Sequence, residues 1–171
     1  MTPAQLLTEL FGRIVTSAEA AVDGLTEDQL ATRPTGTANP IGWLVWHLAR
    51  VQDDHVAEVA GLEQVYTAQG YAERFGLPFD VTDIGYGQTS AEVGQVRADA
   101  ALLTEYLRAV HEQTTGYLSG LGAADLDRVV DEGWDPPVTL GVRLASVVND
   151  DLQHAGQAAY VRGLLGGPET L

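Results

Sequence analysis

Hydrophobic residues recur at steps of three and four along four long segments of this chain, which is the spacing of an α-helix with one buried face. The first two segments cover about residues 3–23 and 40–61. The third runs from Thr89 to about residue 121, and the fourth begins at Thr139. No stretch alternates polar and apolar residues convincingly, so the pattern predicts helices and no strand.

Polar capping residues and glycines mark the ends of these predicted helices. Thr2 and Asn39 each precede a proline, a residue favoured in the first helical turn. Thr89 and Glu92 have the spacing of a capping box, in which two side chains satisfy free N–H groups at a helix start. The run Gly166-Gly167-Pro168 is predicted to end the fourth helix.

The segments between the helices differ in character. Residues 26–30 read as one short capped turn, and residues 125–131 as another. Residues 62–89 lose clear periodicity and gather glycines and aromatic residues, which predicts a crossover with one short helix near Ala72. We expect this crossover to cover one end of the helices and to wall a pocket. Prolines make residues 134–137 an extended or turn segment.

Four amphipathic helices with a long crossover between the second and third predict an all-α four-helix bundle. The 171 residues suit one domain spanning 1–171, which can bury a sizeable core without disulfides or a structural metal. Within such a bundle, side chains from facing helices converge, and buried metal sites are commonly built in this way.

The charge balance narrows the possible partners. The chain has 24 acidic residues against nine basic ones, all arginine, for a net charge of −15. Such a surface repels phosphate backbones and anionic lipids, so neither nucleic acid nor a membrane is an expected partner. No secretory leader or membrane-spanning apolar run is evident, so we expect a cytoplasmic protein.

Cysteine is absent from the chain. This excludes a disulfide framework, a thiolate zinc site and a cysteine nucleophile carried by the protein itself. Any thiol chemistry would therefore need a thiol supplied by a small molecule.

Three ionisable residues interrupt the hydrophobic faces of two helices. His47 lies on the face of the second helix, and Asp150 and His154 lie one turn apart on the fourth. Burying such groups costs several kcal/mol unless a partner offsets it. Two imidazoles and one carboxylate are a competent set for a divalent metal and leave coordination positions open for water or substrate. Asp151 could replace Asp150, or orient an imidazole.

Other interpretations of these residues are also open. A helical His–Asp pair is more often a hydrogen-bonded core pair than a metal site. Trp43 and Trp46, beside His47, are interpreted as ordinary core residues. Polar neighbours around His111 indicate a structural or exposed histidine.

Several motifs together resemble the DinB-like superfamily, in particular its actinobacterial branch related to mycothiol-dependent maleylpyruvate isomerases and thiol S-transferases. The resemblance spans nearly the whole chain. The residues that carry it are Gly42-Trp43-Leu44-Val45-Trp46-His47-Leu48, Arg74-Phe75-Gly76-Leu77-Pro78, Asp83-Ile84-Gly85-Tyr86-Gly87, Trp134-Asp135-Pro136-Pro137-Val138-Thr139-Leu140-Gly141, His154-Ala155-Gly156-Gln157 and Tyr160-Val161-Arg162-Gly163.

The resemblance implies a four-helix bundle that holds a divalent metal through three histidines. His47 and His154 match two of them, and the middle position is Asp150, where many relatives have histidine. Zinc is the first choice of metal, with nickel, iron or manganese as others. The implied cofactor is a low-molecular-weight thiol such as mycothiol, bacillithiol or glutathione. Arg162, two turns beyond His154, could meet a carboxylate of cofactor or substrate, or form a surface ion pair.

We favour a metal-dependent small-thiol S-transferase or isomerase that acts on a small-molecule substrate. A metal-dependent hydrolase or a non-haem iron enzyme is the alternative within enzymes. A non-catalytic bundle that binds a small molecule or forms a homodimer is the alternative outside them. A requirement for a thiol would distinguish the S-transferase or isomerase from the hydrolase or iron enzyme. Bound metal would distinguish either enzyme from the non-catalytic bundle.

Overall fold

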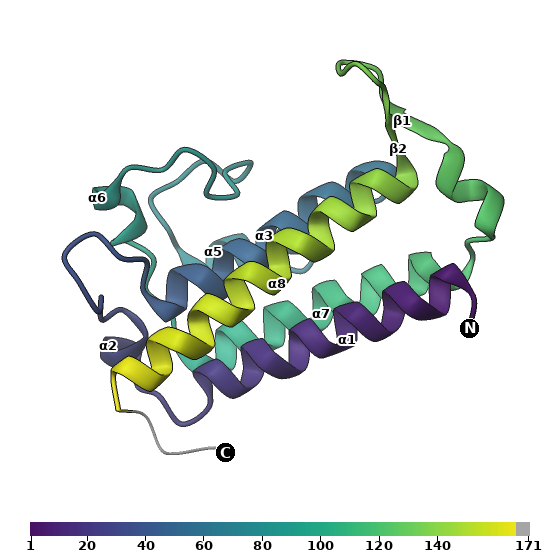
Figure 1. Cartoon of the computed structure of the whole chain (residues 1–171). Helices are drawn as coiled ribbons and strands as arrows, with labels where there is room; N and C mark the ends of the chain where they lie inside the picture. The colour runs from purple at the N-terminus through teal and green to yellow at the C-terminus, as the bar shows by residue number, and fades with distance from the viewer. Residues whose placement is uncertain (167–171) are drawn as a thin grey trace.

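Four long helices form the framework of the computed structural model, which describes residues 1–166 (Figure 1). They are α1 (Pro3–Val22), α3 (Ile41–Ala60), α7 (Ala100–Ser119) and α8 (Leu140–Leu164). The predicted all-α four-helix bundle is therefore confirmed. No helix in the described part of the chain is both long and apolar enough to cross a bilayer.

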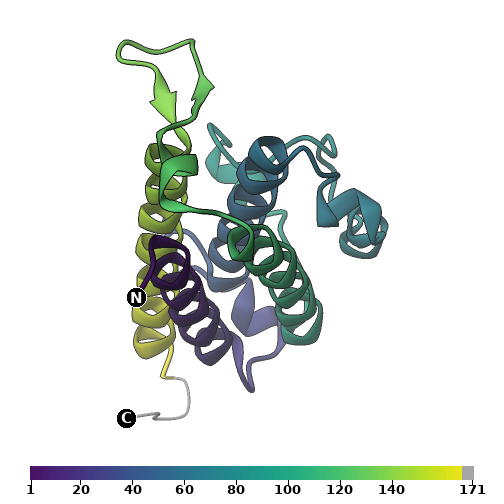
Figure 2. The same cartoon turned by 90° about the vertical axis from the view of Figure 1, so that its right-hand side faces the viewer.

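The order of packing explains why the chain needs a long crossover. Helix α8 packs on α1 and α3, and α7 packs on the same two helices from the other side. Figures 1 and 2 show α1 and α8 running in one direction and α3 and α7 in the other. Because consecutive parallel helices cannot be joined by a tight turn, the chain must return along the bundle between α3 and α7.

The crossover contains three short helices: α4 (Val65–Ala68), α5 (Tyr71–Phe75) and α6 (Ser90–Val93). The short helix predicted near Ala72 is α5. The predicted beginning of the third long helix is wrong, since α7 starts only at Ala100, where Asp99 caps it.

The capping box at Thr89 is present, but it opens α6, a helix of four residues. Val96 and Ala98 are buried although they lie outside any helix. Because these buried residues continue the hydrophobic pattern, that pattern shows no break between α6 and α7.

The other helix boundaries follow the sequence closely. Thr2 caps α1 and Thr139 caps α8, as predicted, and Thr26 caps the short α2 (Glu27–Leu30). The cap of α3 is Pro40 rather than Asn39, a shift of one residue. Helix α8 ends at Leu164, and Gly167 and Pro168 of the predicted terminating run lie outside the described residues.

A short β-hairpin between α7 and α8 was not predicted. After a 3-10 helix, η1 (Ala123–Asp127), strand β1 (Val129–Asp131) pairs antiparallel with β2 (Val138–Thr139). The hairpin projects beyond the first residues of α8 (Figures 1 and 2). Strands of three and two residues are too short to show an alternating pattern, which explains why the sequence did not reveal them.

A buried polar network fastens the crossover to α3. Arg50 and Asp53 are both buried, and Arg50 donates to the carbonyls of Val81 and Asp83 at 3.0 and 3.3 Å. The carboxylate of Asp53 accepts hydrogen bonds from the N–H groups of residues 65 and 66 at 2.8 Å each. The hydroxyl of Tyr106 on α7 donates to the same carboxylate at 2.8 Å. Both ends of the crossover are thus tied to one helix.

We predict that Tyr106→Phe lowers the free energy of unfolding by about 1–3 kcal/mol, because the change leaves a buried carboxylate short of one donor. Urea denaturation followed by circular dichroism measures the effect. Tyr160→Phe is the matched control, since Tyr160 is exposed and its hydroxyl makes no hydrogen bond within residues 1–166. Equal stability of Tyr106→Phe and the control would show that the network does not hold the crossover.

Candidate metal centre

His47, Asp150 and His154 converge where α3 faces α8. One possible ligand atom from each lies within 4.8 Å of the others. Oδ2 of Asp150 is 3.9 Å from Nε2 of His47 and 3.7 Å from Nε2 of His154. The structure therefore brings together the three residues that the sequence singled out, from two helices.

These distances do not fit a hydrogen-bonded core pair, which requires donor and acceptor within about 3.2 Å. Oδ2 of Asp150 is buried and has no hydrogen-bond partner in the described structure. A divalent ion held tetrahedrally at about 2.0–2.2 Å from each donor places neighbouring donors roughly 3.4 Å apart. The spacing and the unpartnered oxygen thus fit a metal better than they fit a direct His–Asp hydrogen bond.

Hydrogen bonds on the far side of each ring orient both imidazoles. Nδ1 of His47 lies against the carbonyl oxygen of Ile84, and because a carbonyl only accepts, Nδ1 carries the proton. Nδ1 of His154 donates to Oε1 of Gln157 at 2.9 Å. In the neutral form of each ring, Nε2 then carries the lone pair and faces Asp150, which is the arrangement of metal-binding histidines.

Burial keeps His47 in the neutral form that a metal requires. Its side chain is 2% exposed. Burial lowers the pKa of His47 below its ordinary value, and the nearby imidazole of His154 lowers it further, against the opposing effect of the Ile84 carbonyl. An uncharged imidazole at neutral pH is ready to bind a cation without first losing a proton.

A turn of the crossover places the Ile84 carbonyl beside His47. The carboxylate of Asp83 accepts from the N–H of Gly85 at 2.7 Å and from the Gln88 amide at 3.0 Å. The oxygen of Gln88 in turn accepts from the indole N–H of Trp43 at 2.8 Å. Gly85 has φ +100°, and a Cβ at this position would lie 2.6 Å from Nδ1 of His47. Only glycine fits here.

Aromatic rings enclose the histidine pair. Trp43 stacks on His47 with ring centroids 4.5 Å apart and lies edge-on to His154 at 6.0 Å. Tyr86 meets the His47 ring edge-on at 5.2 Å. The interpretation of Trp43 and Trp46 as buried residues is confirmed, and Trp43 also forms a wall of the candidate site.

Asp151 lies apart from this group, although it is the next residue on α8. Its side chain is completely buried, and neither of its oxygens has a hydrogen-bond partner in the described residues. Burial, together with the charge of Asp150, holds the pKa of Asp151 well above its usual range, which favours the protonated form of its carboxyl group. The structure places Asp150, and not Asp151, beside the two histidines.

Arg162 lies elsewhere than either sequence interpretation suggested. It is buried, and its guanidinium donates to the carbonyls of Ala21 and Asp23 at 3.1 and 2.7 Å, at the end of α1. This position is about 12 Å along the helix axis from His154, at 1.5 Å per residue. Arg162 therefore caps α1 instead of facing a cofactor or forming a surface ion pair. His111 is half-buried on α7 and is not part of the site.

A cavity of about 400 Å³ adjoins the candidate metal centre and reaches Asp150. Tyr86 of the crossover lines it, so the expectation that the crossover walls a pocket is confirmed. The remaining lining comes from α3, the hairpin and α8: Val51, His55, Trp134, Val138, Val142, Arg143, Ser146, Val147 and Asn149. The cavity thus reaches Asp150 of the candidate metal centre and is lined by residues from four separate parts of the chain.

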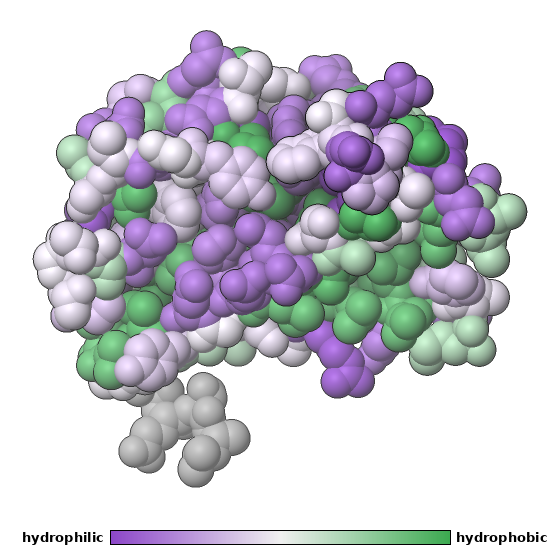
Figure 3. All heavy atoms as spheres, turned by 45° about the horizontal axis from the view of Figure 1, so that its top comes forward, coloured by the Kyte–Doolittle hydropathy of each residue, from purple (hydrophilic) through white to green (hydrophobic). Residues whose placement is uncertain are grey.

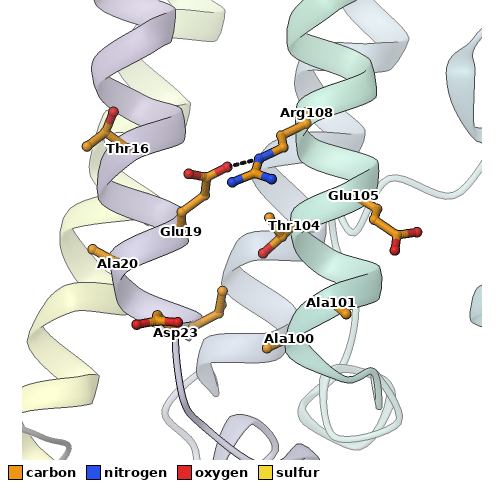
Figure 4. A pocket seen from close by; sticks show the side chains of 10 residues that line it. Thr16, Glu19, Ala20, Asp23, Ala100, Ala101, Thr104, Glu105 and Arg108 are labelled. Atoms are coloured by element: carbon orange, nitrogen blue, oxygen red, sulfur yellow. Dashed lines mark hydrogen bonds and ion pairs between the residues drawn. The ribbon is translucent and has the colours of Figure 1, made fainter.

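A second cavity, of about 550 Å³, lies between α1 and α7. Figure 4 shows Glu19 of α1 paired with Arg108 of α7 across it. Its lining consists of short side chains, three acidic residues and Arg108, and includes no imidazole. It is separate from the candidate metal centre, which lies between α3 and α8.

Comparison with known proteins identifies the family and the fold. The profile of the mycothiol-S-transferase family matches residues 6–167. The chain belongs to the mycothiol-S-transferase family. A crystal structure of a conserved protein from Enterococcus faecalis is 32% identical, with a TM-score of 0.90 over 98% of this chain and 99% of that one. No curated protein sequence is significantly similar to this chain.

Membership of the mycothiol-S-transferase family confirms the resemblance inferred from the motifs. It does not by itself identify the residues around the cavity. Sequence reasoning did not assign His55, Tyr86, Trp134 or Arg143 to a pocket, because they meet only after the crossover and the hairpin have folded. The Asp83-Ile84-Gly85-Tyr86-Gly87 motif was a usable signal, since two glycines in five residues indicate a specialised turn.

For this family member, we predict that Gly85→Ala lowers the affinity for divalent metal more than tenfold. The added Cβ would displace the His47 ring and its carbonyl contact. Isothermal titration with Zn²⁺ measures the change.

Gly87→Ala is the matched control, because Gly87 also has a positive φ, +72°, while nothing lies within 4 Å of its would-be Cβ. It carries similar backbone strain but no clash, so its metal affinity should match the wild type. Equal affinities for all three proteins would exclude the proposed role of the turn.

Proposed function

We propose that this protein is a divalent-metal-dependent enzyme that transfers the sulfur of a small, mycothiol-type thiol to an electrophilic substrate, or uses that thiol in an isomerisation. The observation that carries the proposal is the buried, unpartnered Oδ2 of Asp150 between the Nε2 atoms of His47 and His154. Membership of the mycothiol-S-transferase family supports the choice of thiol.

His47, Asp150 and His154 would hold the metal. Two neutral imidazoles and one carboxylate suit zinc first, and also nickel, iron or manganese. When bound, such an ion lowers the pKa of a thiol, so that a thiolate is available at neutral pH. Three protein ligands leave room for that sulfur.

The protein's own groups orient and shield the site. The carbonyl of Ile84 keeps the His47 proton on Nδ1, and Gln157 does the same for His154. Trp43 covers the inner side of both rings and restricts water there. Because the chain has no cysteine, the nucleophilic sulfur must come from the co-substrate.

In the transfer reaction the thiol loses its proton and its sulfur forms a bond to an electrophilic carbon. The leaving group departs from that carbon with the bonding electron pair, so a thioether, a proton and the leaving group are the products. The cavity that reaches Asp150 gives the electrophile a route to this point. An isomerisation instead ends when the thiol is eliminated again.

The donor set also favours one second candidate. Two histidines and one carboxylate form the ligand set of non-haem iron enzymes. A zinc, nickel, iron or manganese ion held by the same residues could instead activate water, as in metal-dependent hydrolases. Such an enzyme would keep the same metal ligands but would not need a thiol.

The test measures metal content and thiol-dependent turnover on the same samples. The protein is purified without a histidine tag or chelator, analysed by elemental mass spectrometry, and assayed with mycothiol and 1-chloro-2,4-dinitrobenzene. We predict near-stoichiometric metal and thiol-dependent turnover in the wild type. His47→Ala and Asp150→Ala should lose both.

His111→Ala is the control, since it removes a histidine outside the site and should retain metal and activity. A wild-type protein that neither carries nor takes up metal would overturn the proposal. Metal without any thiol-dependent reaction would support the hydrolase or non-haem iron alternative instead.

A further inference from the structure

Two exposed aromatic side chains flank the cavity that reaches Asp150. Tyr86 of the crossover is 57% exposed, and Trp134 of the hairpin is 68% exposed, yet both line the same cavity. Its volume of about 400 Å³ is in the range of small-molecule sites. Figure 3 shows hydrophobic and hydrophilic side chains mixed over the surface that carries the crossover and the hairpin. Large aromatic rings left uncovered at a cavity are well placed to cover a ligand.

Four valines form the aliphatic part of the cavity wall, beside the polar or charged side chains of His55, Arg143, Ser146, Asn149 and Asp150. Val51 comes from α3, Val138 from β2, and Val142 and Val147 from α8. The hydroxyl of Ser146 is engaged with the carbonyl of Val142 at 2.9 Å and adds little free polarity. The four valines and the two aromatic rings together favour a ligand with a flat, apolar face.

The charges around the cavity argue against an anionic ligand. Among the described lining residues, Arg143 is the one cation, and only 14% of its side chain is exposed. It pairs with Glu58 at 2.7 Å and with Asp131 at 3.1 Å, so two carboxylates already balance its charge.

His55 adds no positive charge to this wall. Its Nδ1 lies 3.2 Å from Nη1 of Arg143, which can only donate, so Nδ1 is unprotonated and the imidazole is neutral. Asp150 contributes a negative charge at the inner end, and the net charge of the chain is −15. The protein's side chains offer an entering anion no unbalanced cation, and the excess positive charge of the proposed metal over Asp150 would be balanced by the thiolate.

We propose that this cavity binds the electrophilic co-substrate, and that this co-substrate is an uncharged, planar, apolar molecule held against Trp134 and Tyr86. The inference rests on the proposed function and adds the substrate class to it. Trp134 is then a positioning residue that determines specificity, while Asp150 marks the end of the cavity at which the reacting carbon meets the sulfur.

A binding experiment without any thiol tests this inference separately from catalysis. Equilibrium dialysis compares 4-nitroaniline, which is neutral, with 4-nitrobenzenesulfonate, a planar anion that is a weak metal ligand. We predict that wild-type protein binds 4-nitroaniline at least about tenfold more tightly. Trp134→Ala should weaken that binding roughly three- to tenfold, the range expected for loss of one aromatic contact, and Trp134→Phe should retain most of it.

Tyr160→Ala is the matched control. Tyr160 is 69% exposed, nearly the same as Trp134, but it lies on α8 outside the cavity lining, so its removal should leave binding unchanged. Equal or tighter binding of the anion would overturn the inference. So would a Trp134→Ala variant that binds as well as the Tyr160→Ala control.

Turnover kinetics identify which co-substrate occupies the cavity. With mycothiol and 1-chloro-2,4-dinitrobenzene, Trp134→Ala should raise KM for the electrophile and leave KM for the thiol unchanged. A rise in KM for mycothiol alone would assign the cavity to the thiol and overturn the inference. The dialysis experiment requires no thiol and no turnover. A negative dialysis result would therefore overturn the substrate class without affecting the metal and thiol tests, and negative metal or thiol results would not affect the dialysis result.

Discussion

The contact between the carbonyl of Ile84 and Nδ1 of His47 is the interaction on which the candidate site depends. It fixes which nitrogen of His47 carries the proton, and so which nitrogen faces Asp150. The contact exists only because Gly85 lets the backbone come this close to the ring. Arg50 of α3 anchors this turn by donating to the carbonyl of Asp83. The guanidinium of Arg50 also contacts the hydroxyl of Tyr106 on α7.

The burial of Oδ2 of Asp150 is the feature that points to a bound cation. A buried carboxylate oxygen without a hydrogen bond is costly, and Oδ2 of Asp150 has no hydrogen-bond partner in the described residues although two imidazoles lie beside it. Three electron-pair donors facing one another repel, and a cation held among them would offset that repulsion. Aspartate in place of a third histidine adds a full negative charge, which strengthens the attraction for such a cation.

The fold and the three candidate ligands could be predicted because both follow from helical periodicity. Asp150 and His154 are one turn apart on a single helix, and His47 interrupts the buried face of another. The start of α7, the hairpin and the contacts of Arg162 could not be predicted. Val96 and Ala98 are buried without being helical, the strands are too short to show a pattern, and Arg162 reaches α1 only once the bundle has assembled.

The state of the imidazole nitrogens provides the most direct test of this account. The chain contains only four histidines, so long-range ¹H–¹⁵N correlation spectra of ¹⁵N-labelled protein with and without Zn²⁺ can resolve each ring. We predict that His47 and His154 keep protonated Nδ1 atoms while their Nε2 signals move to the metal-bound range, and that His111 is unchanged. Binding through Nδ1 of His47, or no response of either ring at saturating zinc, would contradict the account.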